Sequence, residues 1–253
     1  MKDLTAKVKS NEKIAENIYM LTLTLPESAG EIHGGQFVNV STGDSSHLLR
    51  RPLGVCIADG KDISVCYQVK GEGTQKLSAA EAGDKLNVLL PLGNGFDLEG
   101  YKNIAVIGGG VGVFPLIATI REHYRHKNFY SYIGFRNKSA VCLLNELEKS
   151  KSLTVTTDDG SYGKKGNAVE AYFADAETVQ ADAIIACGPP VMLKVLKREI
   201  EERGIKTPCF VSLEERMGCG VGACLVCVCK KADGNNARVC KDGPVFDINK
   251  VEL

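Results

Sequence analysis

Residues 104–115 read Ile-Ala-Val-Ile-Gly-Gly-Gly-Val-Gly-Val-Phe-Pro, an apolar run that passes through glycines into a helical pattern ending near His123. This order predicts a buried strand, a tight turn and a helix. Glycines at such a turn let the backbone approach a pyrophosphate, and the helix N-terminus favours its negative charge. Tight strand–helix packing explains the same glycines, and the strict G-x-G-x-x-G pattern fails because position 113 is Val. The candidate nucleotide-binding residues here are Gly108, Gly109, Gly110, Val111 and Gly112.

The alternation of strand and helix continues beyond this turn. Residues 129–135 and 183–186 are apolar runs of strand length, and residues 141–149 and 191–202 have helical patterns. Repeated strand–helix units indicate a parallel sheet, so residues 99–205 are predicted to form a Rossmann-like, nucleotide-binding α/β domain. The last strand ends at the sheet edge where ligands bind, although an ordinary turn that begins a helix has the same composition. The residues at that end are Cys187, Gly188 and Pro189.

Residues 1–98, on the N-terminal side, have the pattern of β-structure. Short runs such as residues 20–25 and 63–69 are apolar or alternating, and Gly, Pro, Asp and Asn separate them. Many short strands at this spacing predict a closed or nearly closed barrel. The predicted fold class is therefore a β-barrel followed by an α/β domain and a small C-terminal segment, residues 206–253.

The C-terminal segment is rich in cysteine and too short to hold a core of its own. Five of the ten cysteines lie between positions 219 and 240. Four of them follow the C-x4-C-x2-C…C spacing of plant-type [2Fe–2S] sites, namely Cys219, Cys224, Cys227 and Cys240. Zinc sites usually present two close pairs of cysteines instead. An iron–sulfur cluster is therefore the prediction, and a zinc site with four cysteine ligands is the alternative.

The residues around these cysteines suit a loop that wraps closely around a cluster. Gly218, Gly220 and Gly222 allow backbone N–H groups to point at sulfur atoms. A turn at residues 233–234, Asp-Gly, predicts a hairpin that returns the fourth ligand, and we expect this thiolate to come from a strand distant from the other three. Cys229 follows Cys227 by two positions and is an alternative ligand, but we interpret it as a strand residue that faces away from the cluster.

Two segments of the N-terminal region are candidate phosphate sites. Arg50 and Arg51 precede Pro52, and an arginine fork suits a phosphate, although a surface arginine pair before a turn has the same sequence. Residues 71–74, Gly-Glu-Gly-Thr, are compatible with an ordinary turn or with a second phosphate cradle.

Composition limits the classes of function. The 253 residues include 31 Lys and Arg and 31 Asp and Glu, so a neutral chain has no electrostatic reason to bind nucleic acid. The N-terminal residues lack the apolar core of a signal peptide. The uncharged stretch 104–120 contains glycines and a proline and is shorter than the roughly 20 apolar residues that a bilayer requires. We therefore expect a cytoplasmic protein with neither a nucleic-acid nor a membrane partner.

In this order, these pieces resemble the ferredoxin–NADP reductase superfamily, in which a flavin-binding barrel precedes a nicotinamide-nucleotide domain. Residues 157–163, 214–224 and 240–246 are similar to the electron-transfer subunits of class 1B dihydroorotate dehydrogenases. The resemblance covers essentially the whole chain. It implies a Greek-key barrel that binds FAD at residues 1–98, an NAD-binding domain at residues 99–205 and a [2Fe–2S] segment at residues 206–253.

The resemblance also assigns cofactor contacts. It implies that Arg51 holds the FAD pyrophosphate and that Leu53 and Gly54, where the superfamily often has Tyr and Ser, lie along the isoalloxazine. The remaining residues that match FAD segments are Pro52, Tyr67, Val69, Gly73 and Thr74. The segments 108–115 and 187–189 match the nicotinamide-nucleotide sites. Arg136 and Lys138 would suit the 2′-phosphate of NADP or a solvated loop, and the resemblance favours NAD.

The cofactors imply a chain of electron carriers. Nicotinamide exchanges a hydride, a [2Fe–2S] cluster moves single electrons, and a flavin does both. By resemblance, the partner is an FMN-containing dihydroorotate dehydrogenase catalytic subunit in pyrimidine biosynthesis, in a heterotetramer with two copies of each subunit. No residue of this chain is predicted to act in dihydroorotate chemistry. The alternatives are a reductase subunit that serves ferredoxin or a sulfur-compound reductase, and a zinc-containing nucleotide-binding regulator.

Overall fold

The computed structural model describes residues 1–44 and 47–253, and its N-terminal part is a closed six-stranded barrel. The strands follow the order β1-β2-β5-β4-β3-β6, and neighbouring strands of the barrel pair antiparallel. Their bounds are β1 Lys2–Ala15, β2 Ile18–Thr24, β3 Phe37–Val40, β4 Arg51–Asp59, β5 Asp62–Gln68 and β6 Lys85–Leu92. Alternate residues of β6 are buried, as expected for a strand with one face toward a barrel core. A short helix, α1 (Glu72–Ser78), lies between β5 and β6.

The second part is a seven-stranded sheet in the order β10-β9-β8-β7-β11-β12-β15. All pairs are parallel except the last, in which β15 runs antiparallel to β12. The bounds are β7 Asn103–Gly109, β8 Asn128–Phe135, β9 Ser152–Thr157, β10 Lys164–Lys165, β11 Ala183–Cys187, β12 Cys209–Ser212 and β15 Val245–Asp247. The two central strands, β7 and β11, are apolar and buried almost throughout because helices cover both faces.

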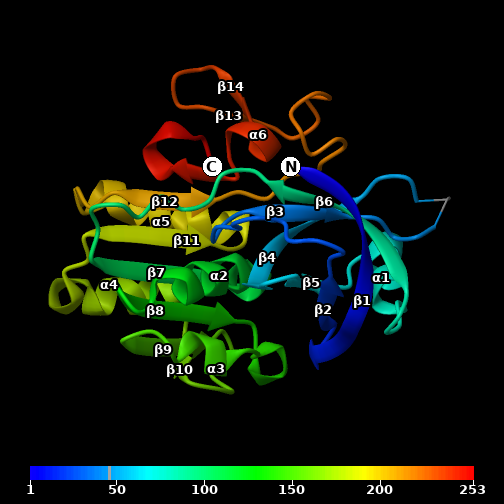
Figure 1. Ribbon diagram of the computed structural model, residues 1–253. Helices are drawn as coiled ribbons and strands as arrows, with labels where there is room; N and C mark the ends of the chain where they lie inside the picture. The colour runs from blue at the N-terminus through cyan, green and yellow to red at the C-terminus, as the bar shows by residue number, and fades with distance from the viewer. Residues whose placement is uncertain (45–46) are drawn as a thin grey trace.

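The helices divide between the two faces of this sheet (Figure 1). They are α2 (Val113–His123), α3 (Leu144–Leu147), α4 (Ala168–Val179) and α5 (Pro190–Glu202). Ile104 and Val106 pack in one core with α2 and α3, whereas Ala105 and Ile107 pack in another with α4 and α5. This division follows from the two-residue period of a strand. The helix expected over residues 141–149 is shorter in the structure, where only Leu144–Leu147 is α-helical.

Helix α2 also joins the sheet to the barrel. A side chain added at Gly54 on β4 would meet Pro115 at 3.1 Å, so the two elements are in contact. The carboxylate of Glu122 lies 2.7 Å from Nδ1 of His33 and accepts a hydrogen bond of 2.8 Å from the backbone N–H of Gly34. Helix α2, which follows the glycine turn, therefore packs directly against the barrel.

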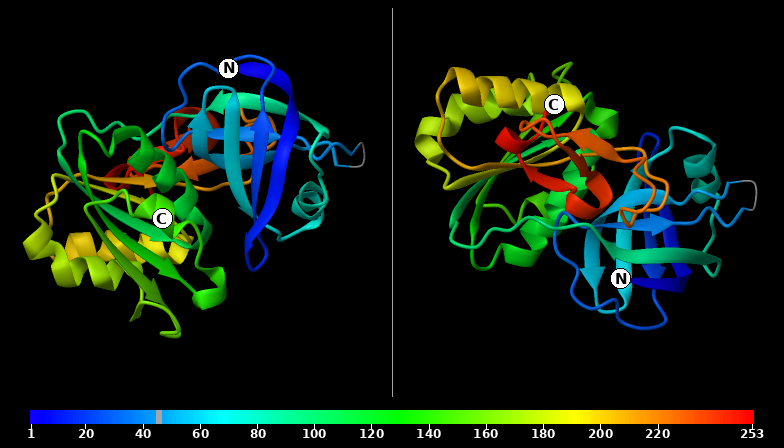
Figure 2. Two further views of the ribbon diagram at one scale, coloured as in Figure 1. Left: turned by 60° about the horizontal axis from the view of Figure 1, so that its bottom comes forward. Right: turned by 90° about the horizontal axis from the view of Figure 1, so that it is seen from above.

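The C-terminal segment lies across the junction of barrel and sheet (Figures 1 and 2). It contains the hairpin of β13 (Val228–Lys230) and β14 (Asn236–Arg238), followed by the short helix α6 (Val239–Asp242). The expected hairpin is thus present, but Cys240 lies in α6 and not on a strand. Because β12 and β15 belong to the large sheet, residues 206–253 share a core with the preceding region. The division at residues 98 and 205 stays a prediction.

Candidate functional site

A large cleft lies at the carboxyl ends of the parallel strands, between β7 and β11, where the strand order reverses. Open α/β sheets bind ligands at this position. Six of the residues expected to bind a nucleotide line it, namely Gly109, Gly110, Val111, Gly112, Gly188 and Pro189. The other two lie elsewhere: Gly108 is enclosed by Ile133, Val113 and Leu116, and Cys187 lines a neighbouring cavity. The structure therefore brings together most, but not all, of this set.

The glycines of the turn serve different purposes. A Cβ atom on Gly112 would lie 2.5 Å from the carbonyl of Cys187, so the close approach of two strand-ending loops requires this glycine. Gly110 has a φ of +53° and nothing within 4 Å of its added Cβ position, which leaves its surface open to the cleft. Tight packing thus accounts for Gly112, while Gly110 leaves space for a ligand before helix α2.

A second cavity lies between the barrel and helix α2. Five of the expected flavin contacts line it, and they are Pro52, Leu53, Gly54, Tyr67 and Thr74. The opposite wall includes Val111, Phe114 and Pro115. A mixed apolar wall with a few polar groups is typical of a cofactor cavity. The sequence assigned these residues, within the segment 108–115, to the nicotinamide nucleotide and not to the flavin cavity, because they become neighbours of β4 only through the packing of α2.

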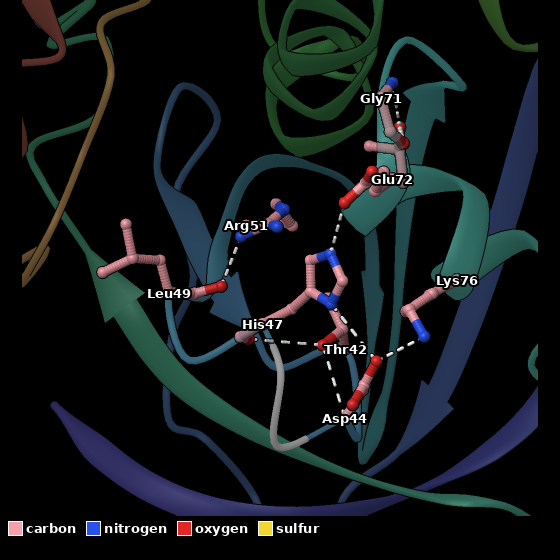
Figure 3. A network of polar contacts seen from close by, with 9 residues as sticks. Thr42, Asp44, His47, Leu49, Arg51, Gly71, Glu72 and Lys76 are labelled. Atoms are coloured by element: carbon pink, nitrogen blue, oxygen red, sulfur yellow. Dashed lines mark hydrogen bonds and ion pairs between the residues drawn. The ribbon is translucent and has the colours of Figure 1, made fainter.

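Three other expected flavin contacts, Arg51, Val69 and Gly73, are not in the lining of that cavity. The guanidinium of Arg51 lies directly against the backbone of Gly73 and donates a hydrogen bond to the carbonyl of Leu49 (Figure 3). The backbone N–H of Val69 donates to the carbonyl of Asn17 at 2.9 Å. Arg51 is therefore a cation held beside the first turn of α1, next to the cavity.

The turn at residues 71–74 is held by its own hydrogen bonds. The hydroxyl of Thr74 accepts from the N–H groups of Lys70 and Gly71, at 3.0 and 3.2 Å, and donates to the carbonyl of Gly71. Nearby, the ring nitrogens of His47 lie 3.2 Å from Asp44 and 3.0 Å from Glu72 (Figure 3). These contacts connect the loop before β4 to α1 and so fix the surroundings of Arg51.

The two cavities share part of their lining. Gln68, Lys70, Val111 and Glu214 belong to both. Solvent reaches the Glu214 side chain in the open cleft, yet the surrounding protein raises the pKa of its carboxyl group, and the positive charge of Lys70 opposes that effect only in part. Burial and the nearby Glu214 also raise the pKa of the Cys187 thiol, which stays protonated at neutral pH. Because the two cavities share these four lining residues, a ligand in one cavity can contact a ligand in the other.

Lys70 and Glu214 are functional candidates that sequence reasoning missed. Glu214 follows β12, a parallel strand, by two residues, so the rule that ligands bind at carboxyl ends of strands was the available signal. Lys70 follows β5 of the barrel, and no pattern in its own segment marks it. Its place at the junction depends on how the barrel meets the sheet.

The four predicted cluster ligands lie in the C-terminal segment, beside the barrel. Cys219 and Cys224 belong to an irregular loop, Cys227 directly precedes β13, and Cys240 lies in α6. Cys227 and Cys240 are buried against Phe37 and Leu92 of the barrel, whereas Cys224 is exposed. The site thus has a buried side against the barrel and an open side. No group of three or more His, Cys, Asp or Glu in the described ranges is arranged to hold a single metal ion.

Backbone N–H groups converge on these sulfur atoms. Cys219 Sγ accepts from Val221, Ala223 and Cys224 at 3.3–3.4 Å, and Cys240 Sγ accepts from Gly222 at 3.1 Å. Removal from water would raise the pKa of Cys219, but these donors outweigh that effect and lower its pKa to about 6. Hydrogen bonds to sulfur are a recurring feature of iron–sulfur sites. The four thiols and their donors therefore fit a [2Fe–2S] cluster.

Charged contacts fix the position of the loop that carries these donors. Arg238 makes hydrogen bonds of 3.0 Å to both carboxylate oxygens of Asp242, and its other terminal nitrogen donates to the carbonyl of Gly222 at 3.3 Å. Bidentate pairs of this kind hold geometry as well as charge. Cys229 lies on β13 opposite Ala237 and is partly buried, and its proposed orientation away from the cluster stays a prediction.

No helix of the described part of the chain is long and apolar enough to cross a membrane.

Comparison with known proteins adds independent findings. Residues 214–252 match the family model of the iron–sulfur cluster binding domain of dihydroorotate dehydrogenase B. The chain is 40% identical to the dihydroorotate dehydrogenase B (NAD(+)), electron transfer subunit, of Streptococcus pneumoniae strain R6, over 98% of both chains. It is also 40% identical to the protein of that name from Bacillus caldolyticus, over 97% of both. The structure of an NADH-dependent reduced ferredoxin-NADP oxidoreductase, studied for flavin-based electron bifurcation, is 29% identical with a TM-score of 0.85, over 98% of this chain and 89% of that one.

Proposed function

The chain belongs to the family of dihydroorotate dehydrogenase B (NAD(+)) electron transfer subunits, and from this premise we propose that it carries electrons from an FMN-containing catalytic subunit to NAD+. The carriers are a [2Fe–2S] cluster and FAD. The observation that supports this function best is that two cavities share a lining, with the C-terminal segment that carries four thiols packed beside the same barrel. When bound, FAD exchanges a hydride with the nicotinamide and single electrons with the cluster.

The barrel and helix α2 would hold FAD. Leu53 and Gly54 would lie along the flavin ring, where Gly54 supplies no side-chain hydroxyl. Arg51 would bind the pyrophosphate, since its planar cation is fixed beside the cavity by Gly73 and the Leu49 carbonyl. Tyr67 is already committed to Asn11, with a hydrogen bond of 3.1 Å, so it would contribute an aromatic wall.

The cleft at the sheet edge would hold NAD. Gly110 leaves the backbone accessible in front of helix α2, where the helix N-terminus favours a pyrophosphate. The shared lining of the two cavities then brings the nicotinamide end of the nucleotide toward the flavin cavity, past Lys70 and Glu214. Residues from the barrel and from the sheet together line this junction.

The cysteine loop would hold the cluster and present it to the partner. Cys219, Cys224, Cys227 and Cys240 would be the ligands. The exposed flank of the loop carries Leu225 and Val226, which are 62% and 56% exposed, so apolar surface is available beside the open side of the site. We assign dihydroorotate oxidation to the catalytic subunit, a heterotetramer with two copies of each chain to the assembly, and the cytoplasm to its location.

The decisive experiment is an anaerobic ultraviolet–visible spectrum of the purified chain with iron and zinc counted, before and after addition of NADH. Flavin bands and a broad iron–sulfur shoulder that bleach with NADH are the expected result. A colourless protein that contains zinc, or a yellow protein that does not respond to NADH, would contradict the proposal and favour the zinc-containing regulator.

The second candidate is a reductase subunit that serves ferredoxin. The similarity to the NADH-dependent reduced ferredoxin-NADP oxidoreductase favours it. Co-purification separates the two functions: an FMN-containing partner that reduces NAD+ with dihydroorotate supports the first, and reduction of ferredoxin without such a partner supports the second.

A further inference from the structure

Asn39, on strand β3, is a buried amide that the proposed function does not use. Its side chain is 1% exposed, and its Oδ1 has no hydrogen-bond partner among the residues that the structure describes. Buried polar atoms are nearly always paired, so an unpaired one calls for a reason. The cysteine segment packs against the outer face of β3, and the other polar atom of the Asn39 amide, Nδ2, faces it.

The neighbours of Asn39 place it between the two redox sites. In the barrel, Asn39 is paired with Pro52 of β4, which lines the flavin cavity. On the other side it faces Gly220, which directly follows Cys219: a Cβ atom added there would lie 2.1 Å from Nδ2 of Asn39 and 3.2 Å from its Cγ. The amide nitrogen is therefore the end of the group that points at the loop.

The orientation of the amide has an electrostatic consequence. Its N–H end is the positive end of the dipole, and it lies toward the loop in a site that is buried on this side. A site that gains an electron becomes more negative, and a nearby positive dipole end stabilises that form. Hydrogen bonds, dipoles and burial around a cluster are known determinants of its reduction potential.

We propose that Asn39 is a positioning residue for the iron–sulfur cluster, which confines Gly220 of the cysteine loop and raises the reduction potential of the cluster through its amide dipole. This inference rests on the proposed function, since it requires a bound cluster. It concerns a residue of the barrel that lies outside the cysteine motif, and it connects the flavin strand to the cluster loop.

The first test is a redox titration of the cluster followed by electron paramagnetic resonance, with the flavin potential of the same sample as an internal reference. Asn39→Leu keeps the approximate volume and removes the dipole. We expect the electron distribution between flavin and cluster to move about tenfold toward the flavin, which is about 59 mV for a one-electron couple. Asn39→Asp, with a negative charge, should move it further in the same direction.

Asn87→Leu is the matched control, because Asn87 is a barrel amide on β6 that binds Arg50 and does not face the loop. It should leave the cluster potential unchanged. Iron retained in Asn39→Leu with an unchanged potential would overturn the proposal. Loss of iron with FAD retained would support it, since a residue that serves only barrel packing would affect FAD as well.

The second test concerns the contact itself and does not require a potential. Gly220→Ala should lower the iron content, because the new methyl group meets the Asn39 amide. Adding Asn39→Ala should restore part of the iron, although the positive φ of +73° at position 220 still disfavours alanine. Equal iron in the single and double variants would contradict confinement by Asn39. If the unmodified chain binds no iron, the proposed function fails; if it does and the variants behave alike, only this inference fails.

Discussion

The proposed nucleotide cleft and the proposed cluster site are built in opposite ways. The cleft is lined by residues from segments that are far apart in the chain, including the glycine turn after β7, the end of β11 and the barrel. The loop carries its own ligands within 22 positions and points its own N–H groups at their sulfur atoms. The first site depends on the packing of the whole sheet, whereas the second depends on local spacing. Substitutions should therefore act differently at the two sites.

The largest effect is expected at the cysteine loop. Cys240→Ser should abolish most of the iron content and leave FAD bound, because none of the four predicted cluster cysteines lines the flavin cavity. Iron and flavin analysis of the purified chain measures both.

Cys229→Ser is the control for that substitution, since Cys229 is the nearby thiol outside the predicted ligand set. It should retain iron. A chain that keeps iron without Cys240 and loses it without Cys229 would show that the ligand assignment is wrong.

A second large effect, on FAD binding, is expected for Arg51, the cation that we propose binds the FAD pyrophosphate. Arg51→Ala should weaken FAD binding roughly 10- to 100-fold, which corresponds to the loss of a charge-assisted hydrogen bond of about 1.5–3 kcal/mol. Fluorescence titration of the FAD-free chain measures the affinity. Arg50→Ala serves as the control because Arg50 pairs with Asp3 at 2.9 Å on the surface, and equal losses in both variants would argue against Arg51.

In the cleft, two neighbouring glycines should respond differently. Gly112→Ala should lower the free energy of unfolding by about 1–3 kcal/mol, the usual cost of overpacking, because its methyl group meets the Cys187 backbone. Gly110→Ala should cost less, about 1 kcal/mol for its positive φ, but weaken NADH binding because its methyl group enters the cleft. Urea unfolding and NADH titration separate the two effects, and a reversed order of stabilities would refute the packing argument.

The smallest effect concerns Glu214, where the cavities meet. Partial removal of water by the surrounding protein raises the pKa of its carboxyl group above the ordinary value of 4.5, so just above pH 4.5 the folded chain holds a proton that the unfolded chain has released. Its contribution to stability is thus present at low pH and is lost as the pH rises through the raised pKa. Glu214→Gln should remove this loss of stability, because glutamine does not ionise. Urea unfolding between pH 4 and pH 8 would then show a small increase in the free energy of unfolding near pH 8. Equal stabilisation at both ends would contradict this assignment.

The contrast between local spacing and the packing of distant segments also explains which features could be predicted from the sequence. The cluster ligands, the strand–turn–helix at residues 104–115 and the hairpin at residues 233–234 are local patterns, and the structure contains the last two as predicted. Lys70 and Asn39 were missed because no local pattern marks them, and Glu214, although it begins the segment 214–224, was not assigned to a cavity. They become notable only when the barrel, the sheet and the cysteine loop meet.

By itself, the sequence determined the order of barrel, α/β domain and cysteine segment, because periodicity and cysteine spacing depend on neighbouring residues. Its match to relatives at 40% identity then established the family. Only the tertiary structure decided that the two cavities share a wall, that β12 and β15 of the C-terminal region complete the large sheet, and that the amide of Asn39 faces Gly220. These are contacts between residues far apart in the chain, and they are set by how whole elements pack.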